Sequence, residues 1–291
     1  MKILIYALGG GWGHLTRAAA LARALRPVEA SILANSPYCA VVREAMPWLA
    51  IESVSSREEA AACVAGSTAD VLVVDTFPRG LGGELAAVLP EWGTRKRILI
   101  HRDLSPEYVR WATGIREFVA AQYDCVLCPG EAGAFGDLPH ARMTAGWIVR
   151  GPVEIDAPAS PVVICAGGNP DELGWYEEVA RLLPDAACVG DAPGWIRVWP
   201  AIDWIARARV VIGGAGYNTV NECLATGTPL IARAWARKYD RQRERAERAG
   251  ATIVETPAEA VRAAREVCKP PAALSSNGAV EAAKWILAPS S

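Results

Sequence analysis

The chain has 291 residues, a length that exceeds one typical domain and suits two domains of about 100–150 residues each. Hydrophobic residues make up 52% and charged residues 21%, a balance typical of a soluble globular protein with a sizeable core. The formal net charge of −2 argues against a nucleic-acid partner, because no excess of positive charge is present to neutralise phosphates.

The amino terminus and the cysteines bear on the expected location of the protein. Residues 1–8 are apolar but too few to span a membrane, so we expect a buried strand rather than a signal peptide. The eight cysteines are scattered through apolar segments, which predicts reduced thiols and a cytoplasmic protein. Cys125 and Cys128 form a CxxC pair without a second pair or a nearby histidine, which favours a strand over a zinc or redox site. A peripheral membrane contact remains compatible with this composition.

Strands and helices alternate along the first half of the chain, which predicts a doubly wound parallel sheet. The predicted strands are 2–8, 28–34, 50–54, 69–75, 97–101 and 124–128. The predicted helices are one from His14 through Leu25, one in 37–45, one at 57–65, one around 82–89 and one near 106–121. Residues 129–142 lack periodicity and are expected to form a loop. Ligands of such sheets bind past the carboxyl ends of the strands.

A proline-rich segment, residues 150–161, predicts a boundary near 155 between a first domain, 1–154, and a second domain, 155–291. The predicted strands of the second domain are 162–166, 186–189, 196–199, 209–212, 230–233 and 251–254. Its predicted helices are 171–183, one ending at Gly227, one led by residues 238–242, one near 257–267 and an amphipathic one at 278–287. The charged residues 243–248 are expected to form a solvated helix face.

A glycine turn in the second domain is the strongest candidate for a ligand site. Residues 213–216 turn the chain from a strand into a helix that begins near Tyr217 or Asn218 and ends at Gly227. The free N–H groups and dipole of a helix N-terminus bind anions such as phosphate. Glu222 lies on the same helix face as Asn218, where a carboxylate could accept hydrogen bonds from two ribose hydroxyls. The alternative interpretation is an ordinary strand, turn and helix with a solvated Glu222.

His14 follows another glycine turn and is the candidate base. A neutral imidazole can accept a proton from a hydroxyl near neutral pH, and such a base usually has an orienting carboxylate. Asp75, at the end of a predicted strand, is the first candidate for that carboxylate and Asp103 the second. The alternatives are that His14 only packs or caps its helix and that Asp75 caps a turn. Arg17, on the same helix face as His14, could bind a phosphate or carboxylate or be solvated.

The glycine turn and the residues that follow it resemble the donor-nucleotide motif of the GT-B glycosyltransferase superfamily. They are most similar to the bacterial peptidoglycan N-acetylglucosaminyltransferases that use UDP-GlcNAc, and more loosely to the UDP-glycosyltransferases. The resemblance implies two Rossmann-like doubly wound parallel-sheet domains that face each other across a cleft, with the helix at 278–287 packing back on the first domain. It implies that the turn holds the diphosphate, Glu222 the ribose, and an Asp/Gln pair the sugar. The matching positions are Gly214, Ala215, Gly216, Tyr217, Asn218, Thr219, Glu222, Asp240, Arg241 and Gln242.

Two further segments match the donor site of these families less closely. Gly168 and Asn169 follow the first strand of the second domain, where the resembled families approach the phosphates or the sugar, but the usual Ser/Thr-Gln is absent. Trp199 begins a segment that resembles the turn bracketing the uracil; the alternative is a core aromatic residue.

The segment around His14 resembles the Gly-x-Gly-His segment of the same transferases, in which the histidine lies at the acceptor cleft. It equally resembles the Gly-x-Gly-His-x-x-Arg segment of related bacterial UDP-sugar hydrolases, in which the histidine activates water. Transfer and hydrolysis therefore both stay open, as does epimerisation on the same fold. The residues expected on the acceptor side are Gly11, Trp12, Gly13, Arg17 and Arg79.

The activity expected from these features is the transfer, with inversion, of a sugar from a UDP-linked donor to a hydroxyl acceptor, with His14 as general base. The acceptor could be a small molecule, a glycan or a lipid-linked sugar. No acidic pair with metal-ligand spacing accompanies the phosphate turn, so we expect no divalent metal and no cofactor beyond the nucleotide sugar as co-substrate. A nucleotide-sugar-binding subunit without turnover is the alternative from another class.

Overall fold

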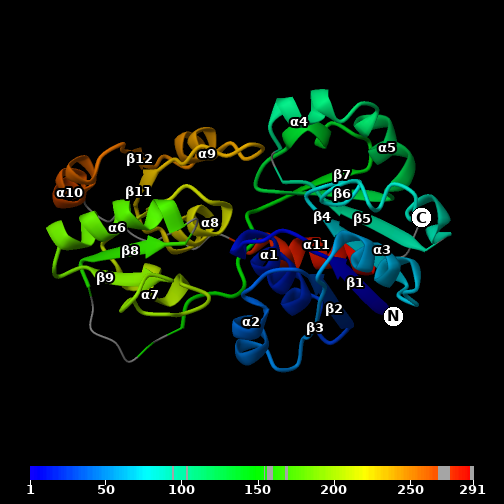
Figure 1. The fold of residues 1–291 in the computed structure, drawn as a ribbon, viewed down its shortest axis with the longest axis horizontal. Coiled ribbons are helices and arrows are strands. Elements are labelled where there is room, and N and C mark those ends of the chain that lie inside the picture. Colours follow the sequence, from blue (N-terminus) through cyan, green and yellow to red (C-terminus); the bar gives the residue numbers. More distant parts are fainter. Residues whose placement is uncertain are drawn as a thin grey trace. The chain divides into compact units, whose positions relative to one another are not determined.

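A computed structural model describes residues 1–93, 95–102, 104–153, 155, 160–167, 170–267 and 276–288. The chain divides into two compact units (Figure 1). The first unit contains Met1–Val149 and the chain from Asn277 onward, and the second contains Arg150–Ser276. The chain thus first passes from one unit to the other between Val149 and Arg150, a few residues before the boundary predicted near 155.

In the described part of the first unit, seven parallel strands form one sheet in the order β3-β2-β1-β4-β5-β6-β7. The strands are β1 Lys2–Tyr6, β2 Glu29–Ala34, β3 Ala50–Ser53, β4 Val71–Asp75, β5 Lys96–Ile100, β6 Cys125–Pro129 and β7 Ala141–Thr144. Valine, isoleucine and leucine fill the buried strands, as expected for a parallel sheet covered on both faces. The strand order reverses between β1 and β4, so their carboxyl ends form the switch point where such sheets bind ligands.

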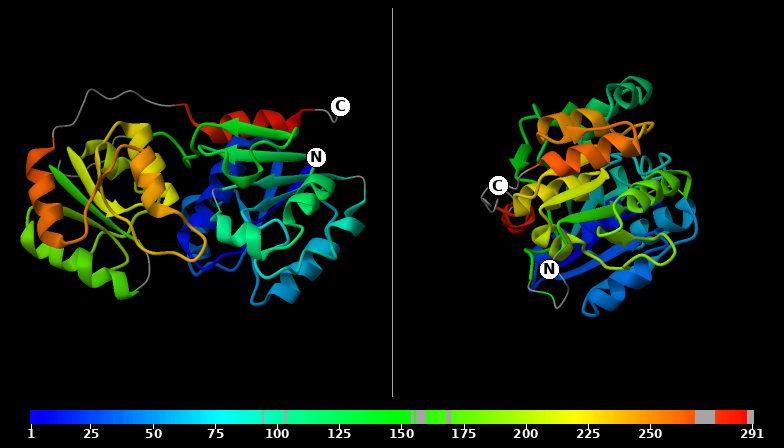
Figure 2. Two further views of the ribbon diagram at one scale, coloured as in Figure 1. Left: turned by 90° about the horizontal axis from the view of Figure 1, so that it is seen from above. Right: turned by 90° about the vertical axis from the view of Figure 1, so that its left-hand side faces the viewer.

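The helices of the first unit largely follow the predicted pattern. They are α1 Trp12–Ala24, α2 Cys39–Ala45, α3 Arg57–Ala65, α4 Pro106–Trp111, α5 Ile115–Gln122 and α11 Gly278–Leu287, with 3₁₀ turns at Pro90–Trp92 and Gly133–Phe135. The last helix, α11, drawn in red in Figures 1 and 2, contacts α1, β6 and β7 although more than a hundred residues separate it from them in sequence.

The predicted helix around 82–89 is wrong, because this stretch forms turns. Gly80 and Gly83 adopt positive φ angles of 85° and 96°, which a helix does not allow. The carboxylate of Glu84 accepts hydrogen bonds from the N–H groups of Leu81 and Gly82, at 3.1 and 2.7 Å. These bonds satisfy the backbone of the loop locally and replace a helical pattern.

Two other expectations for the first unit need correction. The predicted helix near 106–121 is two helices, since Gly114 adopts a left-handed conformation with φ 66° and begins α5. The predicted loop 129–142 contains a 3₁₀ turn and the first residues of β7. This edge strand was missed because its sequence, Ala-Arg-Met-Thr, lacks an apolar run and is only half-buried.

The described part of the second unit holds five parallel strands in the order β12-β11-β10-β8-β9. The strands are β8 Val162–Ala166, β9 Ala187–Gly190, β10 Val210–Gly214, β11 Leu230–Arg233 and β12 Thr252–Ile253. The helices are α6 Pro170–Leu182, α7 Ile202–Arg207, α8 Tyr217–Thr226, α9 Gln242–Arg248 and α10 Pro257–Glu266. The predicted strand 196–199 is wrong: Ile196 forms only an isolated bridge to Val189. The short helix α7 was not predicted.

Helices pack on both faces of this second sheet, as Figures 1 and 2 show. One core cluster joins the sheet to α7, α8 and α9 through Ile205, Val220 and Ala246. The other joins it to α6 and α10 through Val179 and Ala260. The order reverses between β8 and β10, so the glycine turn after β10 lies at the switch point. The two doubly wound parallel sheets confirm the predicted fold class.

No described helix has the length and the continuous apolar sequence needed to cross a bilayer.

The start of α11 is fixed tightly to the segment that follows β7. Asn277 donates from Nδ2 to the carbonyl of Ile148 at 2.8 Å and accepts from the N–H of the same residue at 3.3 Å. The N–H of Gly278 donates to the carbonyl of Gly146 at 3.2 Å. A Cβ atom on Gly278 would lie 1.9 Å from the carbonyl oxygen of Ala145, so no larger residue fits without displacing backbone.

Gly278→Ala should therefore lower the stability of the chain by about 1–3 kcal/mol, because the added methyl group separates α11 from residues 145–148. For a chain of this size, that loss lowers the melting temperature by roughly 2–4 °C per kcal/mol. The matched control is Gly174→Ala in α6, where a Cβ meets nothing within 4 Å and helix propensity favours alanine by about 0.5–1 kcal/mol. Thermal unfolding of both variants tests the contact, which is contradicted if they behave alike.

Candidate functional site

His14 and Asp75 meet at the switch point of the first sheet. His14 lies in the first turn of α1, and Nδ1 of its imidazole is 2.6 Å from Oδ2 of Asp75, the last residue of β4. Arg17, one turn further along α1, donates from Nε to Oδ1 of Asp75 at 2.9 Å and from Nη2 to Oδ2 at 2.6 Å. The same Nη2 reaches the hydroxyl of Thr76 at 3.0 Å. The carboxylate of Asp75 is thus shared by an imidazole and a guanidinium.

The electrostatics of this group favour a neutral His14 beside an ionised Asp75. Burial alone would raise the pKa of Asp75, but the charge of Arg17 and the hydrogen bond with His14 hold that pKa well below its usual range. Burial lowers the pKa of His14; Asp75 raises it, and the charges of Arg17 and Arg102 lower it further, so the pKa stays below its ordinary value.

The position of the proton on the imidazole follows from this charge state. An ionised Asp75 can only accept, so Nδ1 of His14 carries the hydrogen and Nε2 carries the lone pair. Nε2 has no hydrogen-bond partner among the described residues, and the side chain keeps 16% of its surface exposed. A neutral imidazole oriented in this way can take a proton from a hydroxyl or from water.

Gly9 determines where the imidazole lies, a role that sequence reasoning missed. A Cβ atom on Gly9 would lie 2.2 Å from Cδ2 and 2.6 Å from Nε2 of His14, so the ring packs directly on the glycine backbone. The N–H of Gly9 donates to the side chain of Asn35 at 2.7 Å, which fixes the loop. Phe77 lies beyond, with its ring centroid 5.8 Å from that of His14. The signal in the sequence is the additional glycine at the strand end.

The structure corrects the expectation for Arg17 and locates the other residues expected on the acceptor side. Arg17 is neither solvated nor facing a ligand, because it is 1% exposed and its guanidinium binds Asp75. Trp12 is half-buried and stacks on Tyr38 with ring centroids 3.9 Å apart. Arg79 donates to the carbonyls of Thr113 and Gly114, at 3.1 Å each.

Gly11 and Gly13 flank Trp12 at the start of α1. Gly11 is exposed and its carbonyl accepts from the hydroxyl of Ser36 at 3.2 Å; Gly13 follows in the first turn of α1. Asp103 lies outside the described residues. Cys125 and Cys128 lie in the buried strand β6, and burial raises the pKa of Cys128 to about 12. Among the residues that the structure describes, no three His, Cys, Asp or Glu side chains gather as a metal site.

The glycine turn of the second unit begins α8 as predicted. β10 ends at Gly214, Gly216 caps α8, and Gly227 ends that helix in the left-handed conformation with φ 64°. A Cβ atom on Gly214 would lie 3.2 Å from the hydroxyl of Tyr176, so the turn lies close to α6. Ala215 and Tyr217 are 0% and 2% exposed, so their side chains pack in the core of the second unit.

Glu222 is a buried carboxyl group without a partner. It is 5% exposed, and its carboxyl accepts no hydrogen bond within the described residues. Burial, and to a lesser extent the negative charge of Asp203, raise the pKa of Glu222 to about 8, against the opposing effect of Arg150. Arg150 is already bonded to Asp203, through Nη1 to Oδ1 at 2.7 Å and through Nη2 to Oδ2 at 2.6 Å. Arg150, the cation that lowers the pKa of Glu222, is therefore already paired with Asp203.

Asn218, one turn before Glu222 on α8, also has a side-chain acceptor without a hydrogen-bond partner among the described residues. Its side-chain oxygen Oδ1 is buried and has no hydrogen-bond partner in the described part of the chain. Thr219, beside it, is half-buried. Buried acceptors are almost always paired, so two unpaired acceptors at i and i+4 indicate a place for hydrogen-bond donors from a ligand.

Arg245 was missed by the sequence analysis, which treated residues 243–248 as a solvated face. Its side chain is 2% exposed, and it donates from Nη1 to the carbonyl of Ala215 at 3.1 Å and from Nη2 to Oδ1 of Asp240 at 2.6 Å. It thus joins the glycine turn to the predicted sugar-binding carboxylate. The available signal was helical spacing, since Gln242, Arg245 and Ala246 lie on one buried face of α9.

Three further residues predicted to bind the donor lie in the described part of the chain: Gln242, Arg241 and Trp199. Gln242 is 6% exposed and its side-chain oxygen accepts from the N–H of Trp235 at 3.0 Å. Arg241 caps the start of α9, and Trp199 is half-buried in the segment between β9 and α7. Gly168 and Asn169 lie outside the described residues.

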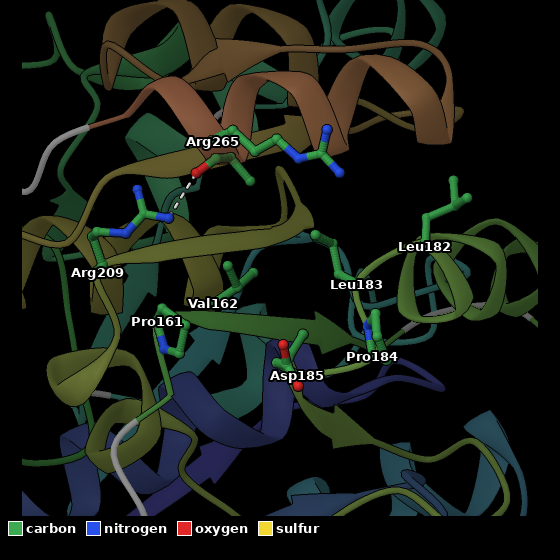
Figure 3. Close-up of a pocket in the computed structure, with 10 residues that line it drawn as sticks. Pro161, Val162, Leu182, Leu183, Pro184, Asp185, Arg209 and Arg265 are labelled. Carbon is green, nitrogen blue, oxygen red and sulfur yellow. Dashed lines mark hydrogen bonds between the residues drawn. The ribbon is translucent and has the colours of Figure 1, made fainter.

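A pocket of about 280 Å³ in the second unit is not where these residues gather (Figure 3). Pro161 and Val162, at the start of β8, line it together with Arg209, just before β10. Arg209 reaches α10, donating from Nη2 to the carbonyl of Ala264 at 2.8 Å. The pocket therefore lies at the amino ends of the strands, whereas ligands of parallel sheets bind at the carboxyl ends.

The network around His14 predicts a specific effect on its titration. Asp75→Asn should lower the pKa of His14 below its already depressed value, because an amide cannot stabilise the imidazolium while Arg17 keeps its charge. The imidazole proton shifts in NMR spectra measure this pKa, and His14→Gln identifies the signal among the three histidines. An unchanged or higher pKa in Asp75→Asn would contradict the assigned hydrogen bond.

Comparison with known proteins identifies the fold. No family model matches the sequence, and the search of curated proteins gives no match. Among solved structures, the glycosyltransferase of kitacinnamycin is similar at 17% identity with a TM-score of 0.66, over 98% of each chain. The spinosyn rhamnosyltransferase SpnG complexed with thymidine diphosphate has 14% identity and a TM-score of 0.61, over 98% of this chain and 95% of that one. MnaA of S. aureus with UDP has 13% identity and a TM-score of 0.58, over 91% and 87%.

At these identities, the likeness establishes the fold and no more. The two parallel sheets match the fold that the sequence resemblance implies for GT-B glycosyltransferases. The finer resemblance to the peptidoglycan N-acetylglucosaminyltransferases stays a prediction. The chain thus has the fold of these solved structures, two of which are glycosyltransferases.

Proposed function

We propose that this chain is an inverting glycosyltransferase that moves a sugar from a UDP-linked donor to a hydroxyl acceptor. The observation that carries the proposal is the buried, unpartnered carboxyl group of Glu222 one turn behind the glycine turn. An unpaired buried carboxyl group is costly, and the two hydroxyls of a ribose would supply the missing hydrogen bonds. The likeness to structures that hold thymidine diphosphate and UDP supports a nucleoside diphosphate as the ligand.

The rest of the proposed donor site follows from the elements around Glu222. The free N–H groups and the dipole at the start of α8 would bind the diphosphate. Asp240, held by Arg245, and Gln242 would bind the sugar hydroxyls. When the sugar leaves the nucleotide, negative charge grows on the diphosphate, and the same N–H groups stabilise it without reorganising. In this proposal the reaction needs no divalent metal.

His14 would act as the general base in this reaction. Nε2 takes the acceptor proton, the acceptor oxygen bonds to the anomeric carbon, and the nucleoside diphosphate leaves with the electron pair of the broken bond. Attack and departure on opposite sides of the anomeric carbon give inversion. Asp75 keeps the imidazole in the required tautomer and stabilises the imidazolium that forms. If water takes the place of the acceptor, the same groups perform hydrolysis.

The donor site is tested by thermal unfolding with UDP and 2′-deoxy-UDP. UDP at roughly 100 times its dissociation constant should add about 2.7 kcal/mol to the stability. Above pH 8, where Glu222 is ionised, the loss of one charge-assisted hydrogen bond to its carboxylate is worth about 1.5–3 kcal/mol, so 2′-deoxy-UDP should bind roughly ten- to a hundredfold more weakly. Glu222→Gln should abolish most of the stabilisation by UDP. If no nucleotide raises the melting temperature of the parent chain, the donor site and the transferase proposal both fall.

The same variant makes a separate prediction for the ligand-free chain. The carboxyl of Glu222 titrates near 4.5 in the unfolded chain and at about 8 in the folded one. Between these values the folded state holds the extra proton, so the stability of the parent falls as the pH rises through this window. Glutamine does not titrate, so Glu222→Gln should match the parent near pH 4.5 and exceed it above pH 8. Equal melting curves across this range would contradict the buried, unpaired state of Glu222.

Catalysis is tested by release of UDP from UDP-sugars with and without hydroxyl acceptors. His14→Ala should lower the turnover rate by about 10²–10⁴-fold, the usual contribution of a general base. It should leave the stabilisation by UDP unchanged, because the proposed nucleotide residues belong to the other unit. Free sugar as the product would indicate hydrolysis and an isomerised sugar epimerisation, whereas UDP binding without turnover would indicate a binding subunit. Loss of activity in EDTA would contradict the metal-independent mechanism.

A further inference from the structure

We propose that the acceptor is a planar aromatic molecule that carries a hydroxyl group, a phenol, and that aromatic side chains around His14 bind it. This inference rests on the proposed transferase function and names the substrate class of the same site. It is carried by the side chains that the first unit places next to the imidazole, and by the polar groups that it withdraws from that surface.

A row of aromatic rings leads from His14 to the surface of the first unit. The ring centroids of His14 and Phe77 are 5.8 Å apart with planes inclined by 25°. Phe77 is followed by Tyr108 at 5.6 Å, and Tyr108 by Trp111 at 6.4 Å. Trp111, at the end of α4, is 75% exposed, an unusual state for a large aromatic side chain. Tyr108 is 7% exposed and Phe77 is half-buried, so the row offers ring surface at its two ends, beside the base and at Trp111.

Further apolar side chains follow the carboxyl ends of β1, β2 and β4. Trp12, two residues before His14, stacks on Tyr38 with an angle of 13° between the rings, and both are half-buried. Leu81, in the turn region that follows Phe77, is 39% exposed. Aromatic rings bind other flat rings by stacking or by edge-to-face contact.

Several polar side chains of the same loops are bonded within the protein, whereas Arg102 lies near enough to His14 for its charge to lower the pKa of the imidazole. Asn35 accepts from the N–H of Gly9, and Ser36 donates to the carbonyl of Gly11. Arg79 donates to two carbonyls of the α4–α5 loop. Glu84 accepts from two N–H groups of its own loop and from the hydroxyl of Tyr6. A carbohydrate acceptor requires several polar partners to replace its hydration, whereas a flat aromatic acceptor requires ring surface.

The chemistry of the base favours the same class of acceptor. A neutral imidazole is a weak base, and general base catalysis is most effective when the proton comes from a group of similar acidity. A phenolic hydroxyl such as that of tyrosine has a pKa of about 10. This value is far closer to the pKa of imidazole than the pKa of an aliphatic alcohol is. Nε2 of His14 takes the phenolic proton, the phenolic oxygen bonds to the anomeric carbon, and the bond from that carbon to the diphosphate breaks, with UDP taking its electron pair.

The test uses the full chain with 4-methylumbelliferone as the phenol and methyl α-glucoside as the non-aromatic hydroxyl compound. Equilibrium dialysis measures binding, and loss of the phenol's fluorescence with a UDP-sugar measures transfer. We expect saturable binding and glycosylation of 4-methylumbelliferone, and no binding of methyl α-glucoside at the same concentrations. Trp111→Ala should weaken binding of the phenol about two- to tenfold, the range of one aromatic contact, and Trp111→Phe should restore most of it.

Trp285→Ala is the matched control, because Trp285 is 46% exposed on α11 and stands outside the aromatic row. It should bind the phenol like the parent. Absence of saturable phenol binding, or equal weakening by Trp111→Ala and Trp285→Ala, overturns this inference. Thermal stabilisation by UDP is measured in parallel: if UDP still stabilises the chain while the phenol does not bind, the acceptor class is wrong and the donor site stands. If the phenol binds and UDP does not, the aromatic site stands and the transferase proposal fails.

Discussion

The ion pair between Arg17 and Asp75 is the interaction on which the site of the first unit depends. Removing two charges from water costs several kcal/mol per ion, and the pair repays this cost only because its hydrogen bonds are short and nearly complete. Once Asp75 is held ionised, it can orient His14 without taking its proton. The guanidinium of Arg17 therefore acts on the imidazole of His14 through the carboxylate of Asp75. The ionised carboxylate fixes the tautomer of the imidazole.

The buried carboxyl groups of the second unit differ in whether an arginine pairs with them. Asp203 is paired with Arg150, and Glu172 with Arg237, so both charges are balanced within the protein. Glu222 has no such cation, although Arg150 is near enough to affect its pKa. The fold thus satisfies the carboxylates that maintain its shape and leaves one unsatisfied at the switch point. Functional sites often retain local costs of this kind while the surrounding structure supplies the stability.

Sequence patterns predicted the elements with strong periodicity and failed where long-range contacts decide the structure. The buried strands and the glycine turn before α8 were found because apolar runs and glycines are local signals. β7 was missed because an edge strand needs no apolar run. Arg245 was taken for a solvated side chain, and Arg17 was expected to bind a ligand or be solvated, because nothing in the sequence marks an arginine that pairs 58 residues away, as Arg17 does. His14 and Glu222 were proposed from the glycines before them, but their charge states depend on burial.

The return of α11 to the first unit has a consequence for folding during synthesis. The second unit is continuous in sequence, from Arg150 to Ser276, and all of it is made before the last helix. The first unit is interrupted, so its sheet must wait for α11 with the surface beside α1, β6 and β7 still uncovered. During synthesis, all residues of the second unit are therefore made before those of the first unit are complete. An uncovered apolar surface on a growing chain is a binding site for chaperones and a route to aggregation.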